Sequence, residues 1–508
     1  MDIRSRAILL ILKMINEIYK KTDMKRIIIM LAIISGLFTI SSCGDKYLDS
    51  FPTSGIVSDL AIRNVSEANY AINGIYDRMQ SNSYYGGYMQ IYGDIRGDDV
   101  QGCEESRTSY YMYRFDHRAI SPNNSGLWTV PFVVMRNASR IIDAIDNVVK
   151  DGTEAQRNAV KGHAIALRAL AHFDILRTHA YPYKKDQGAS PGSPIVDHVL
   201  DLDEFPLRAT VKETYDFITA ELERAIPMMS TTKSNGMLNV YGARALLARV
   251  YLYCENNRKA YDIAAALIEE LKGNAAYVLY TNANYMASFA LTARLGTESL
   301  FEIVNSDNDN QSWDGLPWMM NWFGYKNMCL SQDFIDLMQL DPADVRNGMY
   351  TLRVDSNDNK TKGAIEKYPG PSATAASVAH NLPLIRMSEV YLIAAEAGVK
   401  LNGSERAKAL EYLNTIVKRG NPANSVSDGD FTLDRVLTER RKELVAEGHR
   451  YFDLMRNGLP VKRGANGYHM DNAPLEIDWD NHLSVLPLAA SLFTLVPDLQ
   501  QNAGYTKN

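Results

Sequence analysis

Residues 242–254 read GARALLARVYLYC, and after a polar interruption at residues 255–257 the chain resumes as RKAYDIAAALIEEL over residues 258–271. In both halves apolar residues recur at the three- and four-residue spacing of a helix, and the ENN triplet between them is typical of a turn. Small residues such as Ala245, Ala248 and Ala264 let two helices approach closely. The stretch therefore predicts a helical hairpin in which these alanines are packing residues.

A second stretch of similar dimensions lies nearer the C-terminus. Residues 383–400 have helical periodicity, the sequence NGS at residues 402–404 interrupts it, and ERAKALEYLNTIVKR follows over residues 405–419. Both stretches approximate the tetratricopeptide unit of about 34 residues, in which helix pairs stack on neighbouring pairs. Two unrelated helical hairpins are the alternative interpretation.

Helical periodicity recurs over much of the remaining chain. The predicted helices span residues 67–79, 128–149, 154–179, 211–229, 240–271, 331–340, 384–419 and 433–456. The pattern lapses over residues 277–332 and 351–381 into loops rich in Asn, Asp, Gly and aromatic residues, and loops on a rigid scaffold commonly carry binding residues. We therefore predict an all-α fold: a tetratricopeptide-like helical-repeat scaffold with an irregular, loop-rich ligand-binding face.

The N-terminal segment has the layout of an export signal. Lys25 and Arg26 precede an apolar stretch over residues 27–40, and Ser41-Ser42-Cys43 follows. As a helix the apolar stretch would span about 21 Å, which is short of the roughly 30 Å of a membrane's hydrocarbon core. Small residues before a cysteine are the pattern that a lipoprotein signal peptidase requires. We predict that residues 1–42 are removed and that Cys43 carries lipid; a secretory peptide with an incidental Cys43 is the alternative.

The same segment suggests the organisation of the chain around it. Export signals rarely follow a lead such as residues 1–23, so we predict a translation start at Met24 and a non-native lead before it. Residues 43–59 contain proline, glycine and several Ser and Asp, which favours an extended tether. The globular part is then residues 60–508, with an N-terminal part over about 60–275 and a C-terminal part over about 276–508.

Charge and cysteine content restrict the partners. Loss of residues 1–42 removes seven Lys/Arg and three Asp/Glu. This leaves 47 Lys/Arg and 57 Asp/Glu, so the formal net charge moves from −6 to −10. Nucleic-acid binding needs a basic surface, and no Lys/Arg run with interleaved aromatics is present. Cys103, Cys254 and Cys329 lack the C-x-x-C spacing of metal sites, so at most one disulfide can form, and none is expected to matter.

Several sequence motifs occur in one order along the chain. They are Cys43 with Tyr47-Leu48-Asp49 and Pro52, Ala71-x-x-Gly74-x-Tyr76, ALRALAHFDILRTHAYPY from Ala166, FPLRATVKETYDFI from Phe205, NLPLIRMSEVYLIAAEA from Asn381, LTERRKELVAEGHRYFDLMRNG from Leu437, and LQQNAGY from Leu499. Through these motifs the chain resembles the SusD/RagB family of outer-membrane lipoproteins of Bacteroidetes over nearly all of residues 43–508.

The resemblance implies a function. Members of this family are helical, tetratricopeptide-like proteins that capture glycans or, in some members, peptides, and that act as lids on a SusC-like TonB-dependent transporter. By this resemblance we expect a lipid-anchored protein on the exterior of the outer membrane that binds a nutrient oligosaccharide or polysaccharide, without a cofactor, and delivers it to such a transporter. Peptide capture, as in RagB-like proteins, is the alternative within binding functions.

A surface glycoside hydrolase is the alternative of another class. Glu439, Glu443 and Glu447 recur every fourth residue on one helix face, where a paired acid and nucleophile could be sought. They share that helix with several Arg and Lys residues, which favour ionised, paired carboxylates. We therefore predict a structural charge network and no enzymatic activity. His163, His172 and His179 lack the spacing of a helical zinc site and are interpreted as packing residues.

Aromatic side chains in the irregular segments are the candidate ligand-binding residues. Sugar rings present C–H faces that stack on flat aromatic rings, while their hydroxyls need polar side chains at the edges. Three of the five tryptophans fall within residues 313–325. The candidates are Trp313, Trp318, Trp322, Tyr325, Tyr84, Tyr85, Tyr88, Tyr110, Tyr111, Asp98 and Asp99. The alternative is that these side chains close the irregular region onto the helices.

One segment has a partial match to a calcium-binding loop. Asp355, Asn357, Asn359 and Glu366 stand at positions 1, 3, 5 and 12 of such a loop, but Lys360 replaces the glycine that makes its sharp turn. A solvated hairpin loop without a metal is therefore the preferred interpretation.

Overall fold

The computed structural model describes Lys13 and residues 62–103, 108–119, 126–289, 296–368, 378–464 and 473–507. The predicted signal peptide, Cys43 and the predicted tether lie outside these residues. Residues 62–508 form one compact unit. No helix in the described ranges is both long enough and apolar enough to cross a membrane.

Helices dominate the described chain, which confirms the predicted all-α class. Their bounds are α3 (Val65–Gln80), α4 (Tyr88–Ile95), α5 (Thr108–Tyr113), α6 (Gly126–Asn147), α7 (Glu154–His179), α8 (Val211–Ala225), α9 (Val240–Tyr253), α10 (Asn257–Leu271), α11 (Tyr285–Phe289), α12 (Leu316–Met320), α13 (Gln332–Gln339), α14 (Met387–Leu401), α15 (Arg406–Gly420), α16 (Leu433–Leu444), α17 (Arg450–Asn457) and α18 (Ala490–Leu495).

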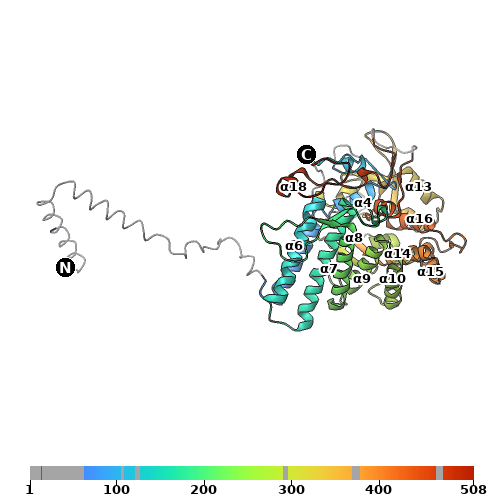
Figure 1. The fold of residues 1–508 in the computed structure, drawn as a ribbon. Helices are drawn as coiled ribbons and strands as arrows, with labels where there is room; N and C mark the ends of the chain where they lie inside the picture. Colours follow the sequence, from blue (N-terminus) through green and yellow to red (C-terminus); the bar gives the residue numbers. More distant parts are fainter. Residues whose placement is uncertain are drawn as a thin grey trace, which may run out of the picture. The chain divides into compact units, whose positions relative to one another are not determined.

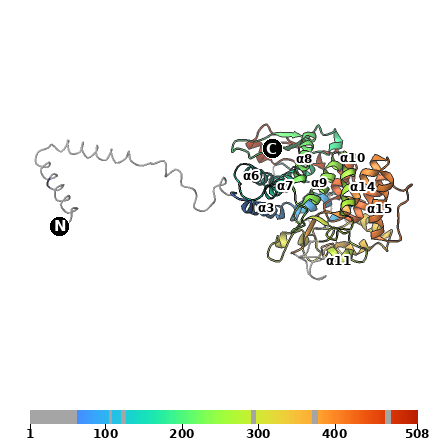
Figure 2. The same ribbon diagram turned by 90° about the horizontal axis from the view of Figure 1, so that it is seen from below.

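The longer helices pack against one another in chain order. Contacts join α6 to α7, α7 to α8, α8 to α9, α9 to α10, α10 to α14 and α14 to α15, and Figures 1 and 2 show these helices side by side. Capping boxes at Thr153 and Thr210 fix the starts of α7 and α8. Each threonine side chain accepts a hydrogen bond from the backbone N–H of the third helical residue, Gln156 or Glu213, and the side chain of that residue accepts one from the threonine backbone N–H. The arrangement confirms the predicted helical-repeat scaffold.

The two predicted hairpins correspond to α9–α10 and α14–α15. Ala245, Ala248 and Ala264 are fully buried, as predicted. The closest approach is at Gly398, where an added Cβ would lie 2.2 Å from the Cβ of Ala409. Only glycine fits there, because the two helices of the second hairpin touch backbone to side chain.

Short antiparallel strands complete the fold. Their bounds are β1 (Val100–Gly102), β2 (Pro191–Pro194), β3 (Arg208–Thr210), β4 (Ser299–Ile303), β5 (Met328–Leu330), β6 (Tyr350–Val354), β7 (Thr361–Ile365), β8 (Leu382–Arg386), β9 (Val461–Lys462) and β10 (Glu476–Ile477). The largest sheet has the order β1-β5-β7-β6, and β2–β3, β4–β8 and β9–β10 form pairs.

Three predicted helices were too long. The helix predicted over residues 211–229 ends at Ala225 and is followed by a 3-10 helix, Ile226–Met228. The helix predicted over residues 384–419 begins only at Met387, because the apolar run before it is β8 and pairs with β4. The helix predicted over residues 433–456 is divided between α16 and α17. Ala446 and Gly448 have positive φ angles in the interruption. The break frees the carbonyl groups of Glu443 and Val445 to accept hydrogen bonds from the Lys367 Nζ, at 3.0 and 2.9 Å.

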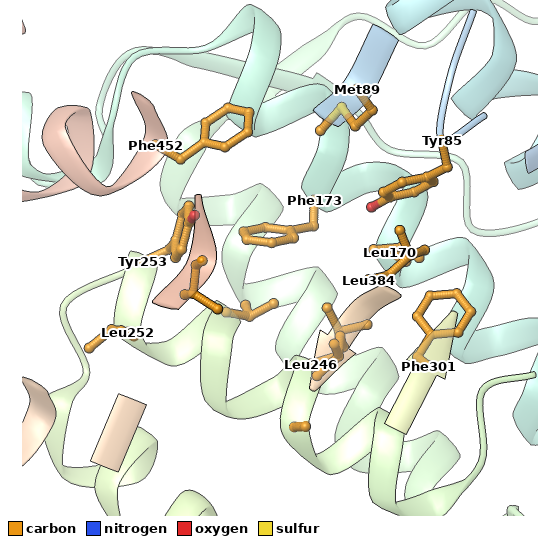
Figure 3. Close-up of a cluster of buried hydrophobic side chains, with 14 of the residues drawn as sticks. Tyr85, Met89, Leu170, Phe173, Leu246, Leu252, Tyr253, Phe301, Leu384 and Phe452 are labelled. Carbon is orange, nitrogen blue, oxygen red and sulfur yellow. The ribbon is translucent and has the colours of Figure 1, made fainter. Parts of the chain in front are cut away.

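The core is continuous between the helical and irregular parts. Figure 3 shows Phe173 and Leu246 from the helices close to Phe301 of β4 and Phe452 of α17. These side chains are all less than 5% exposed. The irregular segments are therefore fixed by the same core that holds the helices together.

A disulfide joins Cys103 to Cys329, across a sequence separation of 226 residues. It links β1 to β5, where Gln101 is the register partner of Cys329. One disulfide agrees with the predicted limit of one, but the spacing in the sequence gave no indication that β1 and β5 pair and so did not identify Cys103 and Cys329 as partners. Cys254 is free, and burial raises the pKa of its thiol to about 11.

Candidate functional site

A cluster of aromatic rings lies on the irregular part of the fold, around α12. We call Trp313, Trp318, Trp322 and Tyr325 the tryptophan platform. The rings of Trp313 and Trp318 stack, with centroids 6.0 Å apart and an interplanar angle of 28°. Tyr325 meets Trp318 edge-to-face at 6.3 Å. The three rings therefore form one continuous aromatic surface.

Local backbone bonds explain why these rings are exposed. Pro317 favours the start of α12, and the helix ends at Asn321, whose Oδ1 accepts from the backbone N–H of Phe323 at 2.9 Å. Leu316, Met319 and Met320 bury the inner face of α12. Trp318 is the half-buried residue of α12, and Trp313, on the preceding 3-10 helix Ser312–Asp314, is 62% exposed.

Two cationic side chains lie beside the aromatic rings of residues 322 and 323. The Nζ of Lys326 lies 5.3 Å from the Trp322 ring centroid and 2.8 Å from a carboxylate oxygen of Asp355. The guanidinium of Arg353 lies 5.0 Å from the ring centroid of Phe323, which is 43% exposed. The sequence-based candidates in this segment were the three tryptophans and Tyr325, and Phe323 was not among them.

The structure brings the three predicted aromatic groups into one region. The backbone N–H of Leu316 donates to the Gly86 carbonyl at 2.7 Å, and α12 packs against α4, which packs against α5. Tyr88 and Tyr110 are half-buried and Tyr111 is 39% exposed. These three tyrosines therefore remain candidates beside the platform.

Tyr84 and Tyr85 are buried and do not belong to an exposed surface. They are 1% and 4% exposed, the Tyr84 hydroxyl donates to Asp174, and the Tyr85 hydroxyl accepts from Arg177 at 3.2 Å. This contradicts their assignment to a ligand surface. The reason is that the segment before α4 turns its tyrosines toward α7.

Asp98 and Asp99 are also internal. Asp98 accepts two hydrogen bonds from Arg450, at 2.6 and 2.9 Å, and Asp99 accepts one from Arg441 at 2.7 Å. Burial opposes ionisation of Asp98, but Arg450 and Arg441 outweigh it and lower the pKa. These carboxylates hold β1 to the α16–α17 region, so they are corrected to structural residues.

The carboxylates of α16 and the turn after it form the predicted charge network. Glu439 pairs with Arg346 at 2.7 Å, Glu443 with Arg386 at 3.1 Å, and Glu447 with Arg386 at 2.6 Å. Burial opposes their ionisation, but the neighbouring cations lower the pKa of each. A catalytic acid requires a raised pKa, so this set is unsuited to glycosidase chemistry.

The three histidines of α7 are packing residues, as predicted. His163 bonds the Tyr76 hydroxyl at 2.8 Å, and the His172 Nε2 accepts from the Val196 backbone at 3.0 Å. Burial lowers the pKa to about 4 for His163 and His172 and to about 3 for His179.

The partial calcium motif is an ion-paired hairpin. Asp355 is fully buried and its two oxygens accept from Lys326 at 2.8 Å and Lys362 at 2.7 Å. Glu366 pairs with Arg353 at 2.9 Å. Lysine ammonium groups occupy the positions that a cation would need, so the structure contradicts the calcium candidate formed by Asp355, Asn357, Asn359 and Glu366. No group of three or more potential metal ligands occurs among the described residues.

A pocket that the sequence did not indicate lies between α3 and β4. Its volume is about 450 Å³, and its walls include Asn73, Asp77, Asn235 and Asp309. These residues come from three segments that are distant in sequence. Only the run of Asn and Asp at residues 305–310 could have drawn attention to it.

Comparison with known proteins identifies the family. The SusD family model matches residues 297–505, and a second model, described as starch-binding associating with outer membrane, matches residues 46–252. A SusD-like protein of Bacteroides ovatus is 22% identical over 84% of this chain and 82% of its own length. A SusD-like protein of Formosa agariphila is 21% identical over 90% of this chain and 97% of its own.

Comparison with solved structures supports the same family. A SusD superfamily protein from Bacteroides vulgatus is 45% identical, with a TM-score of 0.85 over 87% of this chain and all of its own. A putative sugar binding protein from the same species is 37% identical, with a TM-score of 0.81 over 88% of this chain and all of its own. Surface glycan-binding protein A of Bacteroides thetaiotaomicron, solved with laminarihexaose, shares the fold at 20% identity, with a TM-score of 0.69 over 86% of this chain and 99% of its own. The chain described here belongs to the SusD family.

Proposed function

We propose that this protein is a non-catalytic, lipid-anchored glycan-binding protein of the outer cell surface, which delivers an oligosaccharide to a SusC-like TonB-dependent transporter. The observation that carries the binding function is the stacking of Trp313, which is 62% exposed, on the half-buried Trp318. Flat aromatic rings suit sugar faces, and a relative at 37% identity is a putative sugar binding protein, while a fold neighbour is a surface glycan-binding protein. The paired state of the buried α16 carboxylates supports a role without catalysis.

The platform can be tested by truncating its rings. Trp313→Ala and Trp318→Ala are expected to weaken binding of a soluble oligosaccharide about tenfold or more, which corresponds to about 1.4 kcal/mol. The melting temperature of Trp313→Ala should stay unchanged, because its ring is mostly exposed. The measurement is calorimetric titration with a panel of neutral hexasaccharides, beside a thermal melt.

Tyr70→Ala is the matched control, since Tyr70 is 68% exposed on α3 and outside the platform. If both tryptophan variants bind as tightly as the wild type, the platform is not the binding surface. A mixture of tryptic peptides titrated in parallel tests the peptide alternative. New reducing ends after incubation with the same hexasaccharides would contradict a non-catalytic role.

The anchor rests on Cys43. Cys43→Ala is expected to abolish incorporation of labelled palmitate and to release the protein from the membrane fraction, whereas a matched Cys254→Ala variant should fractionate like the wild type. An intact precursor that keeps residues 1–42 is the other expected result; if Cys43→Ala is processed and fractionates like the wild type, the anchor assignment is wrong. Co-purification of the wild type with a TonB-dependent transporter from its own outer membrane tests the partner.

A further inference from the structure

The pocket between α3 and β4 is separate from the tryptophan platform. We call it the α3–β4 pocket. Its walls are Asn73, Tyr76, Asp77 and Gln80 of α3, Asn235 and Met237, and Glu302, Ile303, Val304, Ser306 and Asp309 from β4 onward. At about 450 Å³ it falls within the range of roughly 300–1,000 Å³ that small-molecule pockets occupy.

The pocket has an exposed polar rim over a buried floor. Asn73, Asp77, Asn235 and Asp309 are exposed, whereas Gln80 and Glu302 are at most 5% exposed. The amide of Gln80 is held in place, because its Nε2 donates to the Val304 carbonyl at 3.2 Å and to Asn305 at 3.0 Å. The floor is therefore rigid before any ligand arrives.

The chemistry of the walls selects a class of ligand. Amide, carboxylate and hydroxyl groups can hydrogen-bond the hydroxyls of a sugar from several sides. Among the described residues that line the pocket none is lysine or arginine, and three are acidic. Two cations close to these acids stand outside the lining: Arg78 is 4.0 Å from Asp77, and Lys233, which opposes the raised pKa of Glu302, donates to two backbone carbonyls. A carboxylated or sulfated sugar would meet like charge there.

A single loop connects the pocket to the platform. The carbonyl of Asp309 accepts from the Gln80 Nε2 at 3.2 Å, and the side chain of Gln311 accepts from the Asn82 backbone N–H at 3.3 Å. Ser312–Asp314, the short 3-10 helix that carries Trp313, follows immediately. These bonds fix the loop against the end of α3, so pocket and platform are adjacent parts of one chain segment.

We propose that the α3–β4 pocket binds one neutral sugar unit of the glycan that stacks on the tryptophan platform, and that its acidic rim discriminates against acidic glycans. The inference rests on the proposed function. The stacked rings recognise any sugar with an apolar face, whereas the pocket supplies the directional hydrogen bonds that distinguish one glycan from another.

The test uses the full mature chain and two sets of probes, neutral hexasaccharides and hexa-uronates. Asn73→Ala and Asp309→Ala are expected to weaken the best neutral ligand at least fivefold without changing the melting temperature, because both side chains are exposed. Asp307→Ala is the matched control: it lies exposed in the same loop but does not line the pocket. The double variant Asp77→Asn/Asp309→Asn should raise affinity for the hexa-uronates relative to the neutral set.

Each of the other possible outcomes contradicts one stated part of the proposal. If Trp313→Ala loses affinity while Asn73→Ala and Asp309→Ala bind like the wild type, the pocket is not a subsite and the proposed function stands. If the wild type prefers uronates, or the Asp-to-Asn variant leaves the preference unchanged, the charge argument is wrong. If no hexasaccharide binds the wild type, the proposed function fails and the subsite fails with it.

Discussion

Trp313 and Tyr84 are, by residue type, equally suited to stacking on a ligand. Trp313 is 62% exposed on its 3-10 helix, and Tyr84 is 1% exposed with its hydroxyl on Asp174. The difference arises from the elements beside them. Tyr84 and Tyr85 contact Asp174 and Arg177 of α7, whereas Trp313 lies on the 3-10 helix Ser312–Asp314, none of whose residues is buried. Sequence could identify both groups as aromatic, but exposure depends on what packs over each.

Glu302 is a single residue whose titration follows from its position. It is 4% exposed on β4, and burial raises its pKa to about 7 although Ser299, Asn381 and Lys233 oppose the shift. Since the unfolded chain releases this proton near pH 4.5, the folded protein binds the extra proton between about pH 4.5 and 7. The free energy of unfolding therefore falls as pH rises through that window.

Glu302→Gln is expected to raise the free energy of unfolding by up to about 3 kcal/mol at pH 8 and to change it little at pH 4.5. Urea denaturation at the two pH values measures the difference. Glu411→Gln, at an exposed position of α15, is the control. An equal effect of Glu302→Gln at both pH values would contradict the assigned pKa.

At the scale of elements, the glutamates repeated along α16 form a network of ion pairs with arginines of other elements. Its glutamates meet arginines that come from a 3-10 helix, from the end of β8 and from α15, at Arg346, Arg386 and Arg419. The four-residue spacing predicts one helix face for Glu439, Glu443 and Glu447; Glu439 and Glu443 lie on α16, whereas Glu447 lies in the turn after its end at Leu444. The identity of the partners could not be predicted, because they are distant in sequence.

Glu443→Gln tests this network. Glu443 is fully buried, pairs with all three arginines and accepts from the Tyr285 hydroxyl at 3.2 Å. Its loss leaves buried guanidinium groups without their shared charge, so we expect a loss of about 3 to 5 kcal/mol in the free energy of unfolding. Asp434→Asn, exposed on the same helix, should cost under about 1 kcal/mol. Equal midpoints in guanidinium for the two variants would show that the network is not stabilising.

At the scale of the whole molecule, buried neutral histidines make the free energy of unfolding depend on pH. His163, His172 and His179 have pKa values lowered to about 4, 4 and 3 by burial. In the unfolded chain they take up protons near pH 6.5, so stability is lost as pH falls from 6.5 toward 4. Burial also lowers the pKa of His117, His380 and His449, which act in the same direction, whereas it raises the pKa of Glu302 and Asp94, which act in the opposite direction.

The melting temperature is therefore expected to fall steadily between pH 6.5 and pH 4.5, with about 2 kcal/mol lost for each histidine by pH 5. Differential scanning calorimetry at half-unit pH intervals measures this. His172→Gln should flatten the profile, because it removes one of these buried histidines, whereas His198→Gln, at an exposed position, should not. A flat wild-type profile in this range would contradict the assignment.

The sequence by itself determined the helical class, the two tetratricopeptide-like hairpins, the structural role of the α16 carboxylates and the resemblance to the SusD family. These depend on local periodicity and on motifs, which the order of residues contains directly. The tertiary structure decided the rest. It placed Tyr84, Tyr85, Asp98 and Asp99 in the interior, joined Cys103 to Cys329, and formed the α3–β4 pocket from distant segments. The physical reason is that burial, ion pairing and pocket walls arise between elements far apart in the chain, where no local pattern specifies the partner.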